Sequence, residues 1–162
     1  MARALIVGCG CRGRELGAGL AGRGWQVRGT SRTEQGLKAI RAAGIEPAHA
    51  DPDRPGTVLE LCADASVVVW LLGSAHGQTE YVEAIHGPRL ERLLEKLVDS
   101  PVRGFAYEAT GTVAADCLQR GRRIVDEAGE RWRIPVATIS GERDSPGWAE
   151  QATATVAGLL TR

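Results

Sequence analysis

The sequence has no excess of charge of either sign, because 20 lysines and arginines balance 20 aspartates and glutamates. This balance removes a general electrostatic reason to bind nucleic acid or an anionic membrane. No apolar run approaches the roughly 18 residues that span a bilayer, and the first residues lack the apolar core of a signal peptide. We therefore expect a cytoplasmic protein with neither a membrane nor a nucleic-acid partner.

Lysine and cysteine are both scarce. Two lysines, Lys38 and Lys96, stand beside 18 arginines, and we attribute this excess to coding bias rather than to a function of the guanidinium group. The four cysteines, at positions 9, 11, 62 and 117, include one Cys-x-Cys pair but no second pair or histidine at metal-binding spacing. We expect no metal site, and we interpret the thiols as small apolar side chains in a reducing compartment.

Short apolar runs alternate along the chain with segments of helical periodicity. The expected strands are Ala4–Val7, Trp25–Arg28, Ile45–Ala48, Ser66–Leu72, Arg103–Tyr107 and Ile134–Ile139. The expected helices cover residues 14–23, 33–43, 56–63, 89–98 and 113–131, and a last helix begins at Ser145-Pro146. Strands that alternate with helices in this way are typical of βαβ units.

This alternation predicts a single α/β domain over residues 1–162. We expect a doubly wound, mostly parallel sheet of six strands in the Rossmann-like order 3-2-1-4-5-6, with helices on both faces in three αβα layers. The run "SVVVWLL" at 66–72 has the continuous apolar character of a central strand that is buried on both sides.

Glycines 8, 10 and 13 follow the first strand and open the first helix, which is the context that a dinucleotide-binding Gly-x-Gly-x-x-Gly motif requires. Gly8 would permit the tight turn, Gly10 the approach of a pyrophosphate to the backbone, and Gly13 close packing of the helix on the strand. Free amides at the start of the helix would bind the phosphates. The expected contacts are Gly8, Cys9, Gly10, Cys11, Arg12 and Gly13; the alternative is a glycine-rich turn without a ligand.

The acid that NAD sites usually carry at the end of the second strand is missing. The chain reads Thr30-Ser31-Arg32 there, two hydroxyl groups and a cation. A guanidinium fork suits a 2′-phosphate, and Arg12 could reach the same phosphate or the pyrophosphate. We predict binding of NADP(H) in preference to NAD(H); alternatively, Arg32 only starts the next helix in solvent. Sites for FAD and S-adenosylmethionine are disfavoured because both usually carry the missing acid.

Four stretches of the chain resemble the atypical extended short-chain dehydrogenases/reductases, a group that includes NAD-dependent epimerase/dehydratase-like proteins. In order, these stretches are "VGCGCRGRELGAGLAGRGWQVRGTSR", "GIEPAHADPDRP", "ASVVVWLLGSA" and "VRGFAYEATGTV". The resemblance covers roughly residues 1–140 and is most specific in the first fifty. It implies an NAD(P)-binding Rossmann domain, with Asp51 beside the adenine and Leu72, Gly73 and Ser74 beside the ribose and the nicotinamide.

The sequence departs from this family where the family's catalytic residues should stand. Redox-active members use a Ser or Thr after the fifth strand, a Tyr that transfers the proton, and a Lys four residues later that lowers the pKa of that tyrosine. Thr110 stands near the first position, but no tyrosine follows Tyr107 and no lysine follows Lys96. A phenol without such a cation is a poor acid or base near neutral pH. Because only residues 140–162 follow the sixth strand, we also expect most of the substrate-binding lobe to be missing.

Residues that follow the fourth and fifth strands should line the crevice at the carboxyl ends of the sheet. The candidates for catalysis there are Thr110, His76 and Glu108. The alternatives are a helix N-cap for Thr110 and a solvated loop position for His76. We expect His49 and His86 to be structural or on the surface, and residues 74–88 to form a mobile cover over the cofactor.

Two functions remain open from the sequence. The first is a small NADP-dependent oxidoreductase or epimerase-like enzyme with non-standard redox chemistry and an unidentified small-molecule substrate. The second is a non-catalytic dinucleotide-binding module that acts as a sensor or scaffold, which the missing tyrosine and lysine favour. A homodimer that pairs through the helices 89–98 and 113–131 is consistent with either function.

Overall fold

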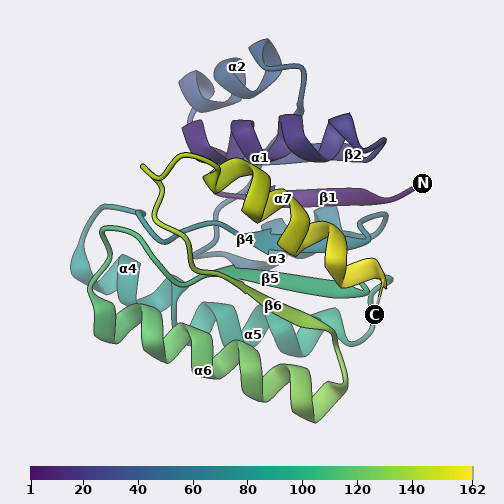
Figure 1. Cartoon of the computed structure of the whole chain (residues 1–162). Helices are drawn as coiled ribbons and strands as arrows, with labels where there is room; N and C mark the ends of the chain where they lie inside the picture. Colours follow the sequence, from purple (N-terminus) through teal and green to yellow (C-terminus); the bar gives the residue numbers. More distant parts are fainter. Residues whose placement is uncertain (162) are drawn as a thin grey trace.

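Six parallel strands run through the centre of the molecule in the order β3-β2-β1-β4-β5-β6 (Figure 1). The computed structural model describes residues 1–161. The strands are β1 (Arg3–Val7), β2 (Gln26–Ser31), β3 (Glu46–His49), β4 (Val67–Trp70), β5 (Gly104–Glu108) and β6 (Val136–Ile139). All five neighbouring pairs are parallel, as in Ile6 opposite both Gly29 and Val69. The predicted fold class and strand order are both confirmed.

Helices cover both faces of this sheet (Figure 1). One face carries α1 (Cys11–Gly22), α2 (Glu34–Ala42) and α7 (Trp148–Gly158). The other carries α3 (Pro55–Leu59), α4 (Thr79–Ile85), α5 (Pro88–Leu97) and α6 (Ala115–Trp132). Short 3-10 turns cover Glu60–Cys62 and Leu159–Thr161. Within the described chain, no helix has both the length and the apolarity to cross a membrane.

The two cores follow from the alternation of side chains along the strands. In β4, Val68 and Trp70 pack into the core under α5 and α6, whereas Val67 and Val69 pack into the core under α1 and α7. All four side chains are fully buried, as expected for a central strand. On α5, the four leucines at 90, 93, 94 and 97 form one buried stripe. Each such leucine contributes about 1.5–3 kcal/mol through its removal from water.

Four element boundaries differ from the prediction in ways that matter for the site. Strand β2 continues to Ser31, so the residues before Arg32 belong to the sheet. Helix α1 begins at Cys11, three residues earlier than expected, directly after the second glycine of the motif. Helix α7 begins at Trp148 behind a left-handed Gly147, and Ser145-Pro146 lies in the preceding turn. Within residues 74–88, for which we predicted a mobile cover, Thr79–Ile85 form helix α4, whose Ile85 packs into the core.

Candidate functional site

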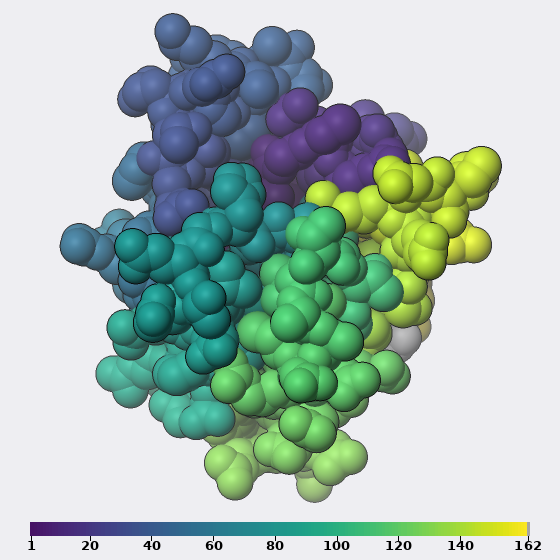
Figure 2. Space-filling view, turned by 90° about the vertical axis from the view of Figure 1, so that its left-hand side faces the viewer, coloured from purple at the N-terminus to yellow at the C-terminus, as the bar shows by residue number. Residues whose placement is uncertain are grey.

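A crevice of about 270 Å³ lies at the carboxyl ends of the strands. Figure 2 shows this end of the molecule. The purple start of the chain lies there between the blue and teal segments on one side and the yellow segment on the other. The described residues that line it are Gly8, Cys9, Gly10, Arg14, Thr30, Ser31, Arg32, Gly36, Ala50, Pro52, Leu71, Leu72, Ser74, Ala75, His76, Tyr81 and Arg143. Ligands of doubly wound folds bind at this edge, where the strand order reverses.

The three glycines of the motif have different reasons to lack a side chain. Gly8 has a φ of +85°, and a Cβ there would lie 2.6 Å from Leu72 Cδ2 and 2.7 Å from the Leu71 carbonyl oxygen. A Cβ on Gly13 would lie 3.2 Å from the sulfur of Cys9. Gly10 differs, because a Cβ built on it meets no described atom within 4 Å. The fold itself requires Gly8 and favours Gly13, whereas no neighbour in the described chain accounts for Gly10.

The start of α1 faces this open position. Gly10 is the N-cap residue, and no described side chain caps the helix or places an acid in its first turn. The first intrahelical donor is the Arg14 amide, which bonds the Gly10 carbonyl at 2.9 Å. The preceding amides therefore lack intrahelical partners and carry the partial positive charge of the helix end. This geometry suits a phosphate group.

The crevice is electropositive, although the chain as a whole has a formal net charge of zero. Three arginines line it, Arg14, Arg32 and Arg143, and none of the described lining residues is an aspartate or a glutamate. A cleft lined by charge of one sign attracts ligands of the opposite sign. The sequence missed Arg14 and Arg143, because neither lies within the spacing of a recognised motif.

Arg32 lies over the ring of Tyr81, with the guanidinium carbon 4.4 Å from the ring centroid. Arg32 is exposed, just beyond β2, and Tyr81 comes from the first turn of α4. Burial raises the pKa of the Tyr81 hydroxyl, and the nearby Arg32 partly offsets the rise. The ring restrains the cation and leaves the edge of the guanidinium free for hydrogen bonds. Sequence reasoning missed Tyr81 because it did not predict α4.

The two hydroxyl groups before Arg32 brace the backbone. The Gly8 amide donates to Thr30 Oγ1 at 3.3 Å, and Thr30 is only 2% exposed. The Thr33 amide donates to Ser31 Oγ at 3.2 Å. Thr30 therefore holds the glycine turn, and Ser31 holds the turn that leads into α2.

Five of the predicted cofactor contacts are not among the residues that line the crevice: Cys11, Arg12, Gly13, Asp51 and Gly73. The guanidinium of Arg12 turns away toward α7 and pairs with Glu15 at 2.8 Å and with Asp144 at 3.5 Å. The Cys11 side chain is exposed. Asp51 Oδ1 accepts a hydrogen bond from the Asp53 amide at 2.9 Å and so closes its own turn. By contrast, Cys9 lines the crevice, and burial raises the pKa of its thiol to about 12, which makes it unreactive.

The loops that follow β4 and β5 are joined by hydrogen bonds. The Gly73 amide donates to Glu108 Oε1 at 2.7 Å, and the Thr112 amide donates to Ser74 Oγ at 3.1 Å. Thr110 Oγ1 donates to the Gly141 carbonyl at 3.0 Å and so holds the loop that follows β6. Helix α6 begins at Ala115 behind Ala114, so the alternative of Thr110 as a helix N-cap is wrong.

Glu108 and Arg143 form a partly buried ion pair at the edge of the crevice. Arg143 Nε donates to Glu108 Oε2 and Arg143 Nη2 donates to Glu108 Oε1, each at 2.9 Å. The Glu108 side chain is 0% exposed and that of Arg143 is 27% exposed. With the Gly73 amide, three N–H groups therefore hold one carboxylate. Of the three catalytic candidates, His76 is exposed and lines the crevice, whereas Glu108 and Thr110 are engaged in structural bonds.

His86 lies behind the crevice wall in a fully buried pair with Tyr107. Its Nε2 is 2.9 Å from the Leu72 carbonyl oxygen and its Nδ1 is 2.7 Å from the Tyr107 hydroxyl. Because a carbonyl only accepts, Nε2 carries the proton and Nδ1 accepts from the tyrosine. Burial lowers the pKa of His86 and raises that of Tyr107. His86 is therefore structural, as expected, and does not lie on the surface; His49 is exposed.

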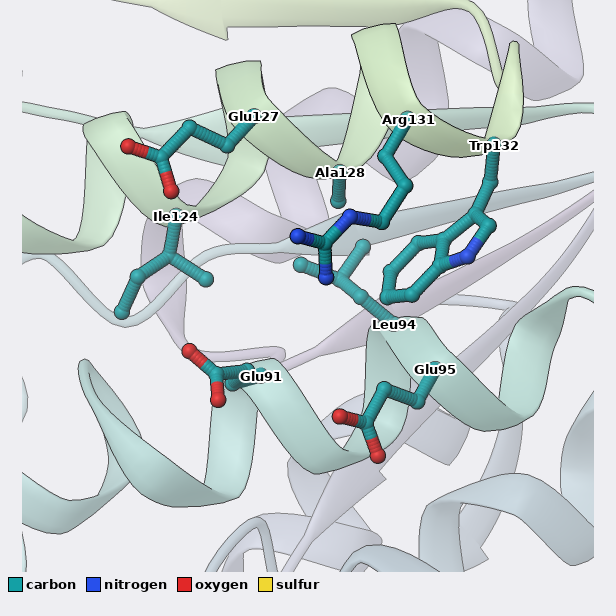
Figure 3. A pocket seen from close by; sticks show the side chains of 8 residues that line it. All are labelled: Glu91, Leu94, Glu95, Ile124, Glu127, Ala128, Arg131 and Trp132. Atoms are coloured by element: carbon teal, nitrogen blue, oxygen red, sulfur yellow. The ribbon is translucent and has the colours of Figure 1, made fainter.

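A second hollow, of about 290 Å³, is lined by residues of α5 and α6 (Figure 3), on the face of the sheet opposite α1. Arg131 and Trp132 of α6 project over it toward Glu91 and Glu95 of α5. The Arg131 guanidinium lies 5.8 Å from the Trp132 ring centroid. This hollow mixes charges of both signs, unlike the crevice.

Comparison with solved structures finds the same architecture in nicotinamide-dependent proteins. A Bacillus halodurans protein described as a proposed NAD-dependent epimerase/dehydratase matches with a TM-score of 0.77 and 16% identity, over 99% of this chain and 90% of its own. The chain has a Rossmann-like fold. A Citrobacter sp. triphenylmethane reductase complexed with NADP(H) matches with a TM-score of 0.64 and 16% identity, over 87% of this chain and 49% of its own. A Bacillus cereus UDP-glucuronic acid 4-epimerase complexed with NAD matches with a TM-score of 0.65 and 17% identity, over 84% of this chain and 54% of its own.

These likenesses, all below 20% identity, show the fold. The chain spans about half the length of the reductase and of the epimerase. A stretch of 46 residues is 44% identical to protein YeeZ of Escherichia coli, and it covers 28% of this chain and 17% of YeeZ. No protein-family profile matches the chain.

Proposed function

We propose that the crevice binds a nicotinamide dinucleotide, NADP(H) in preference to NAD(H). The observation that carries this proposal is Gly10, which faces open space at the start of α1 and which no described neighbour requires to be glycine. A side chain at this position would stand where a pyrophosphate approaches the amides of the glycine turn. The fold of the NAD- and NADP-bound proteins described above supports the same ligand class.

The preference for NADP(H) follows from the charge at the end of β2. Arg32 is exposed, restrained by Tyr81 and free of any carboxylate partner in the described chain. Its guanidinium edge suits the 2′-phosphate, and the absence of an acid leaves no acceptor for the paired ribose hydroxyls of NAD(H). We place the adenine near Asp51 and the nicotinamide near Leu72, Gly73 and Ser74.

We propose that the chain is related to the atypical extended short-chain dehydrogenases/reductases, although it lacks a Tyr–Lys pair at the position where they carry one, and that it acts in the cytoplasm. The bound nicotinamide would supply the hydride chemistry. Among the residues of this chain, Ser74 and His76 in the crevice could orient a substrate or move a proton. Any redox activity would thus use non-standard residues. The competing function, a non-catalytic sensor or scaffold, is favoured by the structural bonds that engage Thr110 and Glu108.

Gly10→Ala tests the cofactor site. The backbone at this residue, with φ −84° and ψ −154°, is extended, so the variant should fold, with only a small loss of stability because alanine is a poorer N-cap than glycine. We expect NADPH affinity, measured by the fluorescence of the nicotinamide, to fall by at least about tenfold. Gly22→Ala, on the same helix and also facing open space, is the matched control and should bind as the wild type does. Equal binding by both variants would overturn the proposal.

We also propose that two copies of the chain pair through α5 and α6. The hollow in Figure 3 offers Arg131 beside Glu91 and Glu95, a set of charges that a second copy related by a two-fold axis could complement. Sedimentation velocity should then show a dimer that Arg131→Glu weakens. A monomer at all concentrations would contradict this pairing.

A further inference from the structure

We propose that Arg143 is a substrate-binding residue that takes a carboxylate group at the end of the crevice opposite Arg32. This inference rests on the proposed dinucleotide site and adds the chemical class of the substrate. It starts from a guanidinium that is fixed in place, lines the crevice and keeps unused donors.

The position of Arg143 is set by Glu108. The residue lies between β6 and α7, a segment that would otherwise leave a long side chain free to move. Two hydrogen bonds of 2.9 Å tie its guanidinium to a carboxylate at the end of β5 that is 0% exposed. The Gly73 amide holds the same carboxylate at 2.7 Å. A ligand would therefore meet a pre-oriented cation and would not have to immobilise a flexible one.

The donors that remain point to an anion with two coplanar oxygens. A guanidinium has five N–H groups. Glu108 uses the one on Nε and one of the two on Nη2, and the described chain provides no partner for Nη1 or for the other Nη2 hydrogen. These groups form a planar edge of the kind that binds a carboxylate through two parallel bonds. Because Glu108 already offsets the charge of Arg143, the remaining planar edge suits a monoanion with two coplanar oxygens better than a phosphate dianion.

The order of the strands places this edge at the reacting end of the cofactor. Arg32 follows β2, on one side of β1, whereas Glu108 ends β5 and Arg143 follows β6, on the other side. A dinucleotide whose 2′-phosphate lies at Arg32 would extend toward β4 and β5 with its nicotinamide. Ser74 and His76, which follow β4, line the same crevice. A substrate could thus present a carbonyl to these two residues and its carboxylate to Arg143.

Binding of small 2-oxo acids tests the inference. We would titrate pyruvate into the wild type saturated with NADPH, follow it by ligand-observed saturation-transfer NMR, and compare methyl pyruvate and inorganic phosphate. Pyruvate should bind about tenfold or more tightly than its ester, because the ester offers no charged oxygens to the guanidinium. Arg143→Lys, which keeps the charge but not the planar edge, should lose this preference and keep its affinity for NADPH. Arg123→Lys, on an exposed turn of α6, is the control and should behave as the wild type.

A second variant covers the case in which Arg143→Lys fails to fold. The double variant Glu108→Gln with Arg143→Met removes the ion pair as a unit, and its glutamine still accepts from the Gly73 amide. It should bind NADPH as the wild type does and show no preference for pyruvate.

Each failure has its own signature. If the wild type does not bind NADPH, the proposed function is wrong. If it binds NADPH but takes pyruvate and its ester equally, or phosphate alone, the inference is overturned while the proposed function stands. The inference is also overturned if Arg143→Lys chiefly weakens NADPH, because Arg143 then contacts the cofactor, or if the folded double variant retains the preference for pyruvate.

Discussion

Removal of the Arg32 side chain should abolish the discrimination between NADPH and NADH. The two cofactors differ in one phosphate, and Arg32 is the cation at the end of β2 where that phosphate is expected. A hydrogen bond to a charged group contributes about 1.5–3 kcal/mol. Because Arg32 is exposed, we take the lower bound, which corresponds to about tenfold in affinity. Arg32→Ala should therefore weaken NADPH binding about tenfold and leave NADH binding unchanged.

The contact with Tyr81 has to be separated from the contact with the phosphate. A cation–π contact at an exposed site contributes about 0.5–1 kcal/mol, and its loss could disturb the wall of the crevice for both cofactors alike. Tyr81→Phe keeps the ring and serves as a reference. Arg41→Ala, on the exposed side of α2, controls for the loss of one positive charge.

The assay is fluorescence titration of both reduced cofactors at low and high salt. The preference of the wild type for NADPH should shrink as salt rises, because ionic screening acts over roughly 10 Å at 0.1 M ionic strength. The preference of Arg32→Ala should be absent at both salt concentrations. Equal losses of NADPH and NADH affinity in this variant, or a wild type that prefers NADH, would refute the role of Arg32.

Three further predictions concern stability. Gly8→Ala should lower the free energy of unfolding by more than about 1 kcal/mol, because the new side chain meets both a positive φ and the Leu71 carbonyl; urea denaturation measures this, and a neutral effect would contradict the steric argument. Tyr107→Phe should cost about 1–3 kcal/mol, since it leaves a ring nitrogen of His86 without its donor. Burial lowers the pKa of His86 below its ordinary value of 6.5, so the unfolded chain takes up a proton at a higher pH than the folded chain does. The contribution of His86 to the free energy of unfolding is therefore fully present above about pH 6.5, and it should fall as the pH drops from there through the folded-state pKa. The wild type should lose stability between pH 6.5 and 5 more steeply than His86→Gln, and parallel profiles would exclude His86 as the cause.

The architecture was predictable because one signal repeats along the chain. Apolar runs that end in glycine or a polar turn mark strands, and the leucines of α5 recur at helical spacing with charges opposite. These patterns extend over only a few residues, so they can be recognised in the sequence without knowledge of the tertiary structure. The same holds for the glycine turn, since the backbone geometry at Gly8 is local.

The parts of the site that escaped prediction depend on contacts between distant segments. Arg143 acquires its role from Glu108, 35 residues earlier, and Tyr81 acquires its role from Arg32 across the crevice. Helix α4 is only seven residues long and shows no complete apolar period. Arg12 looked suited to a phosphate by its place in the motif, but Glu15 and Asp144 draw its side chain to the other side of α1. Spacing along a chain does not encode such pairings.

Among the described residues that line the crevice, those with a permanent positive charge are all arginines. Acetylation and other acyl transfers act on amines, which the crevice does not present among its described residues. A guanidinium also stays protonated throughout the pH range in which proteins are handled. Amine-directed reagents that acylate Lys38 and Lys96 should therefore leave the affinity for an anionic ligand untouched, whereas dicarbonyl reagents that modify arginine should eliminate it.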